Sequence, residues 1–184
     1  RMENGFIYSY PMKGTIDATI PEADRIILED PKELSEHVTI VDLIRNDISQ
    51  VAQDVEVSKF RFISEVKTNE KTLLQVSSEI KGRLIDKDRI GSIIFKLLPA
   101  GSISGAPKNK TVKIISQAEN YDRGFFTGIC GIFDGKVFDS GVMIRFIEKE
   151  NDTFYFKSGG GITALSDPKK EYNEFVDKVY VPIH

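Results

Sequence analysis

The sequence contains no tryptophan and only one cysteine among its 184 residues. A single cysteine, Cys130, excludes an internal disulfide framework, so a reducing compartment, the cytoplasm, is the expected location. No apolar run approaches the roughly 18–20 residues that a membrane span requires, and no membrane association is expected. The sequence also lacks a large excess of positive or negative charge, since it has 25 Lys and Arg and 28 Asp and Glu, which give a net charge of −3. No nucleic-acid partner is therefore expected.

The residues that are present are ordinary for a globular domain, with 40% hydrophobic and 29% charged side chains. Strands are predicted where aromatic and β-branched residues cluster or alternate: 5–12, 60–68, 72–84, 126–133, 136–148 and 153–157. Helices are predicted where apolar residues recur at steps of three and four: 31–52, 86–98, 107–118 and 169–180. Asp30 is a plausible N-cap with Pro31 in the first turn, and Asp134–Gly135 signals a hairpin. Hairpins mixed with separate helices indicate a single α+β domain rather than a doubly wound parallel sheet.

Two of the predicted helices carry pairs of glutamates three residues apart. Glu33 and Glu36 lie near the start of the helix over 31–52, and Glu171 and Glu174 lie on the last helix. At this spacing both carboxylates of a pair share one helical face. Two facing pairs could hold a hard divalent cation, of which Mg²⁺ is the natural choice. The alternative is that acidic residues near a helix N-terminus complement the helix dipole, and for any single pair this alternative is favoured.

Three glycines, Gly159 to Gly161, follow the strand predicted over 153–157. Glycine lets the backbone approach a ligand closely and turn its N–H groups toward an anion. A structural corner is an equally good interpretation for this run alone. A second flexible loop, 101–108, leads into a helix N-terminus, where an anion contact and ordinary N-cap chemistry are both possible.

A few cationic and polar side chains stand in contexts that are unusual for surface residues. Arg145 in the predicted strand over 142–146 suits bidentate recognition of a carboxylate, and its alternative is a solvent-facing charge. Lys13 is a candidate nucleophile if it is desolvated or lies among cations. Lys178 stands four residues after Glu174 and can equally form a helix-surface ion pair. His37 either contacts a substrate or caps a polar face.

These residues belong to motifs that follow one order along nearly the whole chain. The motifs are Pro11–Thr15, Glu33–His37, Ile40–Asp47, Pro99–Lys108, Arg123–Gly124, Gly128, Ile144–Arg145, Gly159–Ile162, Ser166–Pro168 and Glu171–Tyr172. In this order the chain resembles the chorismate-utilising enzymes, which include anthranilate synthase component I, aminodeoxychorismate synthase component I and the isochorismate and salicylate synthases. The resemblance implies antiparallel β-sheets in a sandwich-like core with flanking helices.

The resemblance also implies roles for individual residues. The four residues that match the Mg²⁺-binding acids, which hold a carboxylate of chorismate through the metal, are Glu33, Glu36, Glu171 and Glu174. The residues that match groups holding the carboxylates of the substrate are Thr15, Arg145, Gly160, Gly161 and Lys178. His37 matches a residue beside the ring carboxylate. These assignments are chemically coherent, because chorismate is a dianion and a metal, cationic side chains and backbone amides are suitable anchors for it.

Lys13 discriminates between the members of this family. Many anthranilate synthases have alanine here, whereas aminodeoxychorismate synthases typically have a lysine that is the proposed nucleophile. The resemblance therefore implies aminodeoxychorismate synthase component I, a transferase that makes 4-amino-4-deoxychorismate on the route to 4-aminobenzoate and folate. Its ammonia would come from a glutamine amidotransferase subunit or domain. The alternatives are anthranilate synthase component I and a non-catalytic fragment of either enzyme.

The sequence also departs from the family pattern. Phe126 stands where the family often has tyrosine, and Ile16 stands where it usually has arginine. In the family a Ser-Pro-Glu segment, whose glutamate is the proposed general acid, lies a few residues before the position that corresponds to Arg1. Residues 1–184 are therefore expected to be the C-terminal portion of the chorismate-binding domain, incomplete and inactive by themselves.

Overall fold

The computed structural model describes residues 1–68, 71–163, 166–177 and 179, without the side chains of Glu174 and Asp177. The strands are β1 (Met2–Glu3), β2 (Phe6–Ser9), β3 (Met12–Asp17), β4 (Ala52–Lys67), β5 (Thr72–Leu84), β6 (Ile129–Phe133), β7 (Phe138–Val142), β8 (Phe146–Glu150) and β9 (Thr153–Lys157). The helices are α1 (Ala23–Glu29), α2 (Pro31–Ile48), α3 (Ile90–Leu97), α4 (Gly101–Ser104), α5 (Lys108–Ala118) and α6 (Pro168–Asp177). The predicted α+β class is confirmed.

Strand β5 is the centre of the larger sheet. It pairs with β4 along one edge, and β2 and β3 follow one another along its other edge, all antiparallel. Beyond β2 the order continues through β1 to β7 and β6, while β8 and β9 form a separate two-stranded sheet. The central position of β5 explains its burial, since Val76 and Ile80 have no exposed surface.

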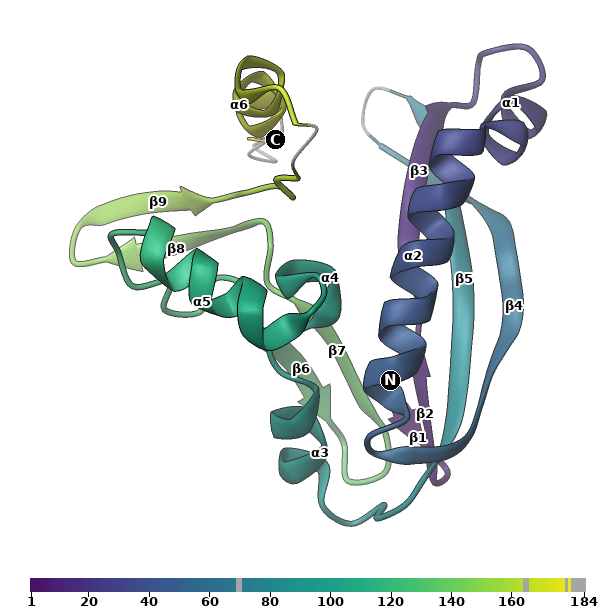
Figure 1. Cartoon of the computed structure of the whole chain (residues 1–184), viewed down its shortest axis with the longest axis vertical. Helices are drawn as coiled ribbons and strands as arrows, with labels where there is room; N and C mark the ends of the chain where they lie inside the picture. The colour runs from purple at the N-terminus through teal and green to yellow at the C-terminus, as the bar shows by residue number, and fades with distance from the viewer. Residues whose placement is uncertain (69–70, 164–165, 178, 180–184) are drawn as a thin grey trace.

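Helix α2 runs along this sheet, as Figure 1 shows. Val41 and Ile48, seven residues apart and therefore on one face of the helix, are buried in the core with Ile80 and Leu84 of β5. Asp30 caps the helix as predicted, because its Oδ1 accepts a hydrogen bond from the Glu33 N–H at 2.9 Å, and Pro31 occupies the first turn. The helix ends at Ile48 rather than at 52, because the chain turns there into β4.

The structure corrects several predicted boundaries. The single strand expected over 136–148 is two strands, β7 and β8, which belong to different sheets. The flexible loop expected over 101–108 begins with the short helix α4, and the helix expected from residue 86 begins at Ile90. Helix α1 was not predicted. Its seven residues are too few for a stable isolated helix, and the Arg61 guanidinium holds its end by donating to the carbonyl oxygens of Ile27 and Leu28.

Within the part of the chain that the structure describes, no helix is long and apolar enough to cross a membrane. Several large apolar side chains are nevertheless exposed on the outer elements. Ile132 of β6 and Phe95 of α3 are 79% and 82% exposed.

Candidate functional site

The N-terminal end of α2 carries three of the predicted site residues. Because Asp30 and Pro31 fix where the helix starts, Glu33, Glu36 and His37 lie in its first two turns. Glu33 and Glu36 are half-buried, whereas His37 has no exposed surface. Two of these side chains therefore remain accessible, and the third points into the fold.

The neighbouring strand β3 contains a β-bulge at Lys13 and Gly14. Met12 pairs with Ser77 and Thr15 pairs with Gln75, so three steps along β3 oppose two along β5. Gly14 has φ = +97°, a conformation that favours glycine, and a Cβ there would lie 3.0 Å from Glu33 Oε2. The bulge therefore brings the β3 backbone close to α2, and bulges of this kind commonly redirect a side chain.

Lys13 and Glu36 form an ion pair across this junction. Lys13 Nζ lies 2.7 Å from Glu36 Oε2, and the two side chains are 48% and 37% exposed. Lys32 approaches the other oxygen of the same carboxylate at 3.8 Å. Since both partners are partly solvated, the pair contributes little to the stability of the fold. Its effect is to hold the Lys13 ammonium beside the N-terminal end of α2.

Glu33 has a buried carboxylate oxygen without a hydrogen-bond partner. Among the described residues, Glu33 Oε2 is one of three buried side-chain polar atoms in this state. A buried carboxylate oxygen without a donor is costly, and binding a cation would remove that cost. The residues at this end of α2 therefore fit the Mg²⁺ predicted from the sequence, with Glu33 as the best-placed ligand.

His37 is held by hydrogen bonds on both ring nitrogens. Nδ1 lies 3.2 Å from the carbonyl oxygen of Lys13, and Nε2 lies 2.7 Å from Ser78 Oγ. A carbonyl oxygen only accepts, so Nδ1 carries the hydrogen and Nε2 accepts from the serine hydroxyl. Burial lowers the pKa of His37, and the charge of Arg61 lowers it further, whereas the hydrogen bond to Lys13 acts in the opposite direction. The contact with substrate predicted for His37 stays a prediction.

Gln75 of β5 is a site residue that the sequence did not reveal. Its Oε1 accepts a hydrogen bond from the Thr15 hydroxyl at 2.9 Å, and its Nε2 donates to the Gly14 carbonyl oxygen at 2.7 Å. It lies 60 residues from Thr15 in the chain, and no local pattern marks it. Only the strand pairing of β3 with β5 could have identified it.

The remaining predicted residues lie on the elements that follow β7. Arg145 is exposed at the bend between β7 and β8, so the prediction that it lies within a strand is wrong. A Cβ on Gly160 would overlap the Phe175 ring of α6, whereas a Cβ on Gly161 would meet nothing within 4 Å. Gly160 is therefore required by packing, and the backbone at Gly161 is open to a ligand.

The second glutamate pair lies on α6, where the structure describes the side chain of Glu171. Glu171 Oε1 accepts a hydrogen bond from the Ser166 hydroxyl at 2.7 Å. The side chain of Glu174 and all of Lys178 lie outside the described residues. Within the described ranges, no three His, Cys, Asp or Glu side chains converge as a metal site. Figure 1 does show α6 and the N-terminal end of α2 at the same, upper end of the molecule.

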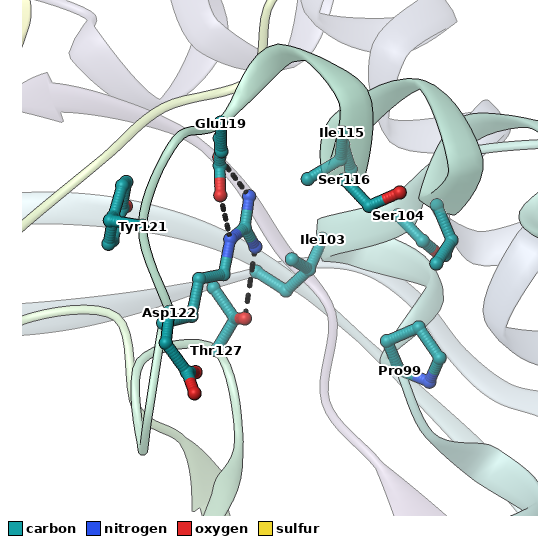
Figure 2. A pocket seen from close by; sticks show the side chains of 11 residues that line it. Pro99, Ile103, Ser104, Ile115, Ser116, Glu119, Tyr121, Asp122 and Thr127 are labelled. Atoms are coloured by element: carbon teal, nitrogen blue, oxygen red, sulfur yellow. Dashed lines mark hydrogen bonds and ion pairs between the residues drawn. The ribbon is translucent and has the colours of Figure 1, made fainter.

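A cavity of about 310 Å³ lies away from these residues, between α4, α5 and the turn that precedes β6. Figure 2 shows Glu119 and Thr127 beside this cavity. The guanidinium of Arg123, which also lines it, donates to the Glu119 carboxylate at 2.6 and 2.7 Å and to the Thr127 hydroxyl at 3.0 Å. The ion pair lowers the pKa of Glu119. Among the described residues that line the cavity, Arg123 is the one cation, and its charge is already paired with the Glu119 carboxylate.

Comparison with known proteins shows the family. The profile of chorismate binding enzymes matches residues 1–184, so the chain belongs to this family. The crystal structure of anthranilate synthase component I from Streptococcus pneumoniae has 29% identity and superimposes with a TM-score of 0.81, over 96% of this chain and 39% of that one. The menaquinone-specific isochorismate synthase of Escherichia coli, at 18% identity and a TM-score of 0.80, covers 96% of this chain and 41% of its own and shares the fold.

Curated relatives carry two kinds of names. An uncharacterised PabA-like protein of Pasteurella multocida is 56% identical over 96% of this chain and 55% of its own length. An anthranilate synthase component 1 of Haloarcula marismortui is 35% identical over 94% of this chain and 36% of its own length. The chain therefore spans about half the length of the first of these relatives and about a third of the second.

Proposed function

We propose that this chain carries part of the active site of an aminodeoxychorismate synthase component I. Such an enzyme converts chorismate and ammonia into 4-amino-4-deoxychorismate with Mg²⁺. The observation that supports this most strongly is the position of Lys13, whose Nζ lies 2.7 Å from Glu36 at the N-terminal end of α2. The PabA-like names of the relatives at 56% identity, rather than anthranilate synthase names, are compatible with this choice.

Lys13 is the proposed nucleophile. Its neutral amine attacks C2 of chorismate, both conjugated ring double bonds shift by one position toward C4, and the C4 hydroxyl leaves. The proton that the alkylated amine releases balances the hydroxide, so the group that leaves is water. Ammonia then forms the new bond at C4 as the bond between Lys13 and C2 breaks, which frees the lysine. Before the attack Lys13 must lose a proton, and Glu36 Oε2 lies within hydrogen-bond reach of its ammonium.

The substrate is a dianion, and the proposed anchors match it. Mg²⁺, when bound, would neutralise the carboxylate that is conjugated with the ring double bonds and so ease attack at C2 and departure of the C4 hydroxyl. The proposed metal ligands are Glu33, Glu36, Glu171 and Glu174. The proposed contacts to the carboxylates of the substrate are Thr15, Arg145, Gly160, Gly161 and Lys178. A glutamine amidotransferase subunit or domain is the proposed ammonia source.

The test is Lys13→Ala in the whole protein, assayed with chorismate, Mg²⁺ and ammonium and coupled to a lyase that releases 4-aminobenzoate. Removal of a group that acts directly in the transition state should lower kcat by at least about 100-fold. Lys32→Ala is the matched control, because Lys32 also approaches Glu36 but at 3.8 Å, and it should keep the wild-type rate. An unchanged rate in Lys13→Ala would refute the assignment.

Anthranilate synthase component I is the second candidate, favoured by the names of the relatives at 32–35% identity. The two functions give different products from the same assay. Anthranilate is fluorescent and forms without a lyase, whereas aminodeoxychorismate needs the lyase to yield 4-aminobenzoate. Residues 1–184 alone are proposed to be the C-terminal portion of the domain, and measurable amination by this chain alone would contradict that proposal.

A further inference from the structure

The β-bulge in β3 is held by side chains from two different elements. At a bulge the hydrogen-bond ladder is interrupted, so its backbone groups need other partners. Here the carbonyl oxygens of Lys13 and Gly14 each accept a hydrogen bond from a side chain. One donor comes from α2 and the other from β5.

His37 is the donor from α2. Its Nδ1–H donates to the Lys13 carbonyl oxygen, and its Nε2 accepts from the Ser78 hydroxyl. Ser78 Oγ in turn accepts from the Arg61 backbone N–H at 3.0 Å. Because His37 and Ser78 have no exposed surface, the direction of the imidazole is fixed by the fold.

Gln75 is the donor from β5. It stands opposite Thr15 in the strand register, and its amide reaches one residue back to the Gly14 carbonyl oxygen. The Thr15 hydroxyl donates to the other end of the same amide. Both ends of the side chain are therefore engaged, and the amide can take only one orientation.

We propose that His37 and Gln75 are positioning residues that direct Lys13 toward its site of action by clamping the bulge on both sides. The inference rests on the proposed function, since Lys13 is the residue whose position it explains. In a regular strand, successive side chains point to opposite faces, so a relaxed bulge would redirect Lys13 away from Glu36. A displacement of about 1 Å can cost about 100-fold in rate.

The main test uses substitutions that remove or restore the two hydrogen bonds to the bulge. Gln75→Glu retains the acceptor for Thr15 but loses the donor to Gly14, and His37→Asn retains a donor near the position of Nδ1. We expect Gln75→Glu and His37→Ala to lower kcat by about 10- to 100-fold with KM for chorismate within about 2-fold. His37→Asn should restore most of the loss. Gln53→Ala, a glutamine on β4 bonded to Arg83, is the control that should match wild type.

A second readout does not depend on turnover. The rate at which acetic anhydride acylates Lys13, followed by mass spectrometry, should rise in Gln75→Glu and His37→Ala above that of the wild type, because the ion pair with Glu36 is loosened. If His37→Ala does not fold, both readouts are measured on Gln75→Glu alone, because the Gln75 side chain is only half-buried. Wild-type kcat and wild-type Lys13 acylation in Gln75→Glu would overturn the inference. If Gln75→Glu behaves as wild type but Lys13→Ala loses activity, the positioning role is refuted and the proposed function is not.

Discussion

At the scale of single residues, two glutamates of the same pair have different surroundings. Glu33 and Glu36 are three residues apart on one helix, yet Glu36 binds Lys13 whereas Glu33 keeps a buried oxygen without a partner. Gly14 lies against the Glu33 side chain, since a Cβ on Gly14 would stand 3.0 Å from Glu33 Oε2. A buried carboxylate without a donor is the state in which a bound cation would contribute most.

Mg²⁺ should therefore stabilise the protein through Glu33. A ligand that binds only the folded state stabilises it by about 2.7 kcal/mol at 100 times its Kd. Adding Mg²⁺ to the wild type should raise Tm, and Glu33→Ala should remove that rise. Asp42→Ala, an exposed acid on the same helix that pairs with Arg45, is the matched control and should keep it. The measurement is thermal unfolding with and without Mg²⁺ and with EDTA, and an undiminished rise in Glu33→Ala would contradict the assignment.

At the scale of the elements, the site depends on where α2 starts and where β3 bulges. The start of α2 was predictable, because Asp30 and Pro31 are strong local signals and the structure confirms both. The bulge was not, since it follows from the register of β3 against β5 and from Gly14 meeting Glu33. Helix α1 likewise depends on Arg61, more than 30 residues away.

Removal of the helix cap should weaken this element measurably. Asp30→Ala loses the acceptor for the Glu33 N–H and should lower the free energy of unfolding by about 1 kcal/mol. Asp30→Ser keeps a capping oxygen and should lie within a few tenths of a kcal/mol of wild type, roughly the spread among good caps. Urea unfolding measures both. Equal stability of Asp30→Ala and wild type would show that the cap contributes nothing.

At the scale of the whole molecule, α2 also links the large sheet to the later elements. Asp47 near its C-terminal end pairs with Lys108 at 2.9 Å, and the two side chains are only 10% and 20% exposed. A Cβ on Gly101 would lie 2.6 Å from Asp47 Oδ2, so α4 packs directly against α2. One helix thus places the glutamates at one end and anchors the second half of the chain at the other.

Breaking this pair should destabilise the fold strongly. Lys108→Ala leaves a nearly buried carboxylate without its cation, and the expected loss is about 3 kcal/mol in urea unfolding. Arg83→Ala is the control, because its pair with Asp54 is exposed and should contribute less than about 1 kcal/mol. Similar losses in the two variants would contradict the structural role assigned to Lys108.

The sequence by itself determined the α+β class, the glutamate pairs, the start of α2 and, through the order of its motifs, the chorismate binding family. The glutamate pairs and the start of α2 depend on patterns within a few residues, whereas the class and the family depend on the order of elements and motifs along the chain, which the sequence also displays directly. Tertiary structure alone decided that Gln75 and His37 hold the bulge, that Glu33 rather than Glu36 keeps an unpartnered oxygen, and that Arg145 lies in a bend. The physical reason is that burial, strand register and close backbone approach are set by contacts between segments far apart in the chain.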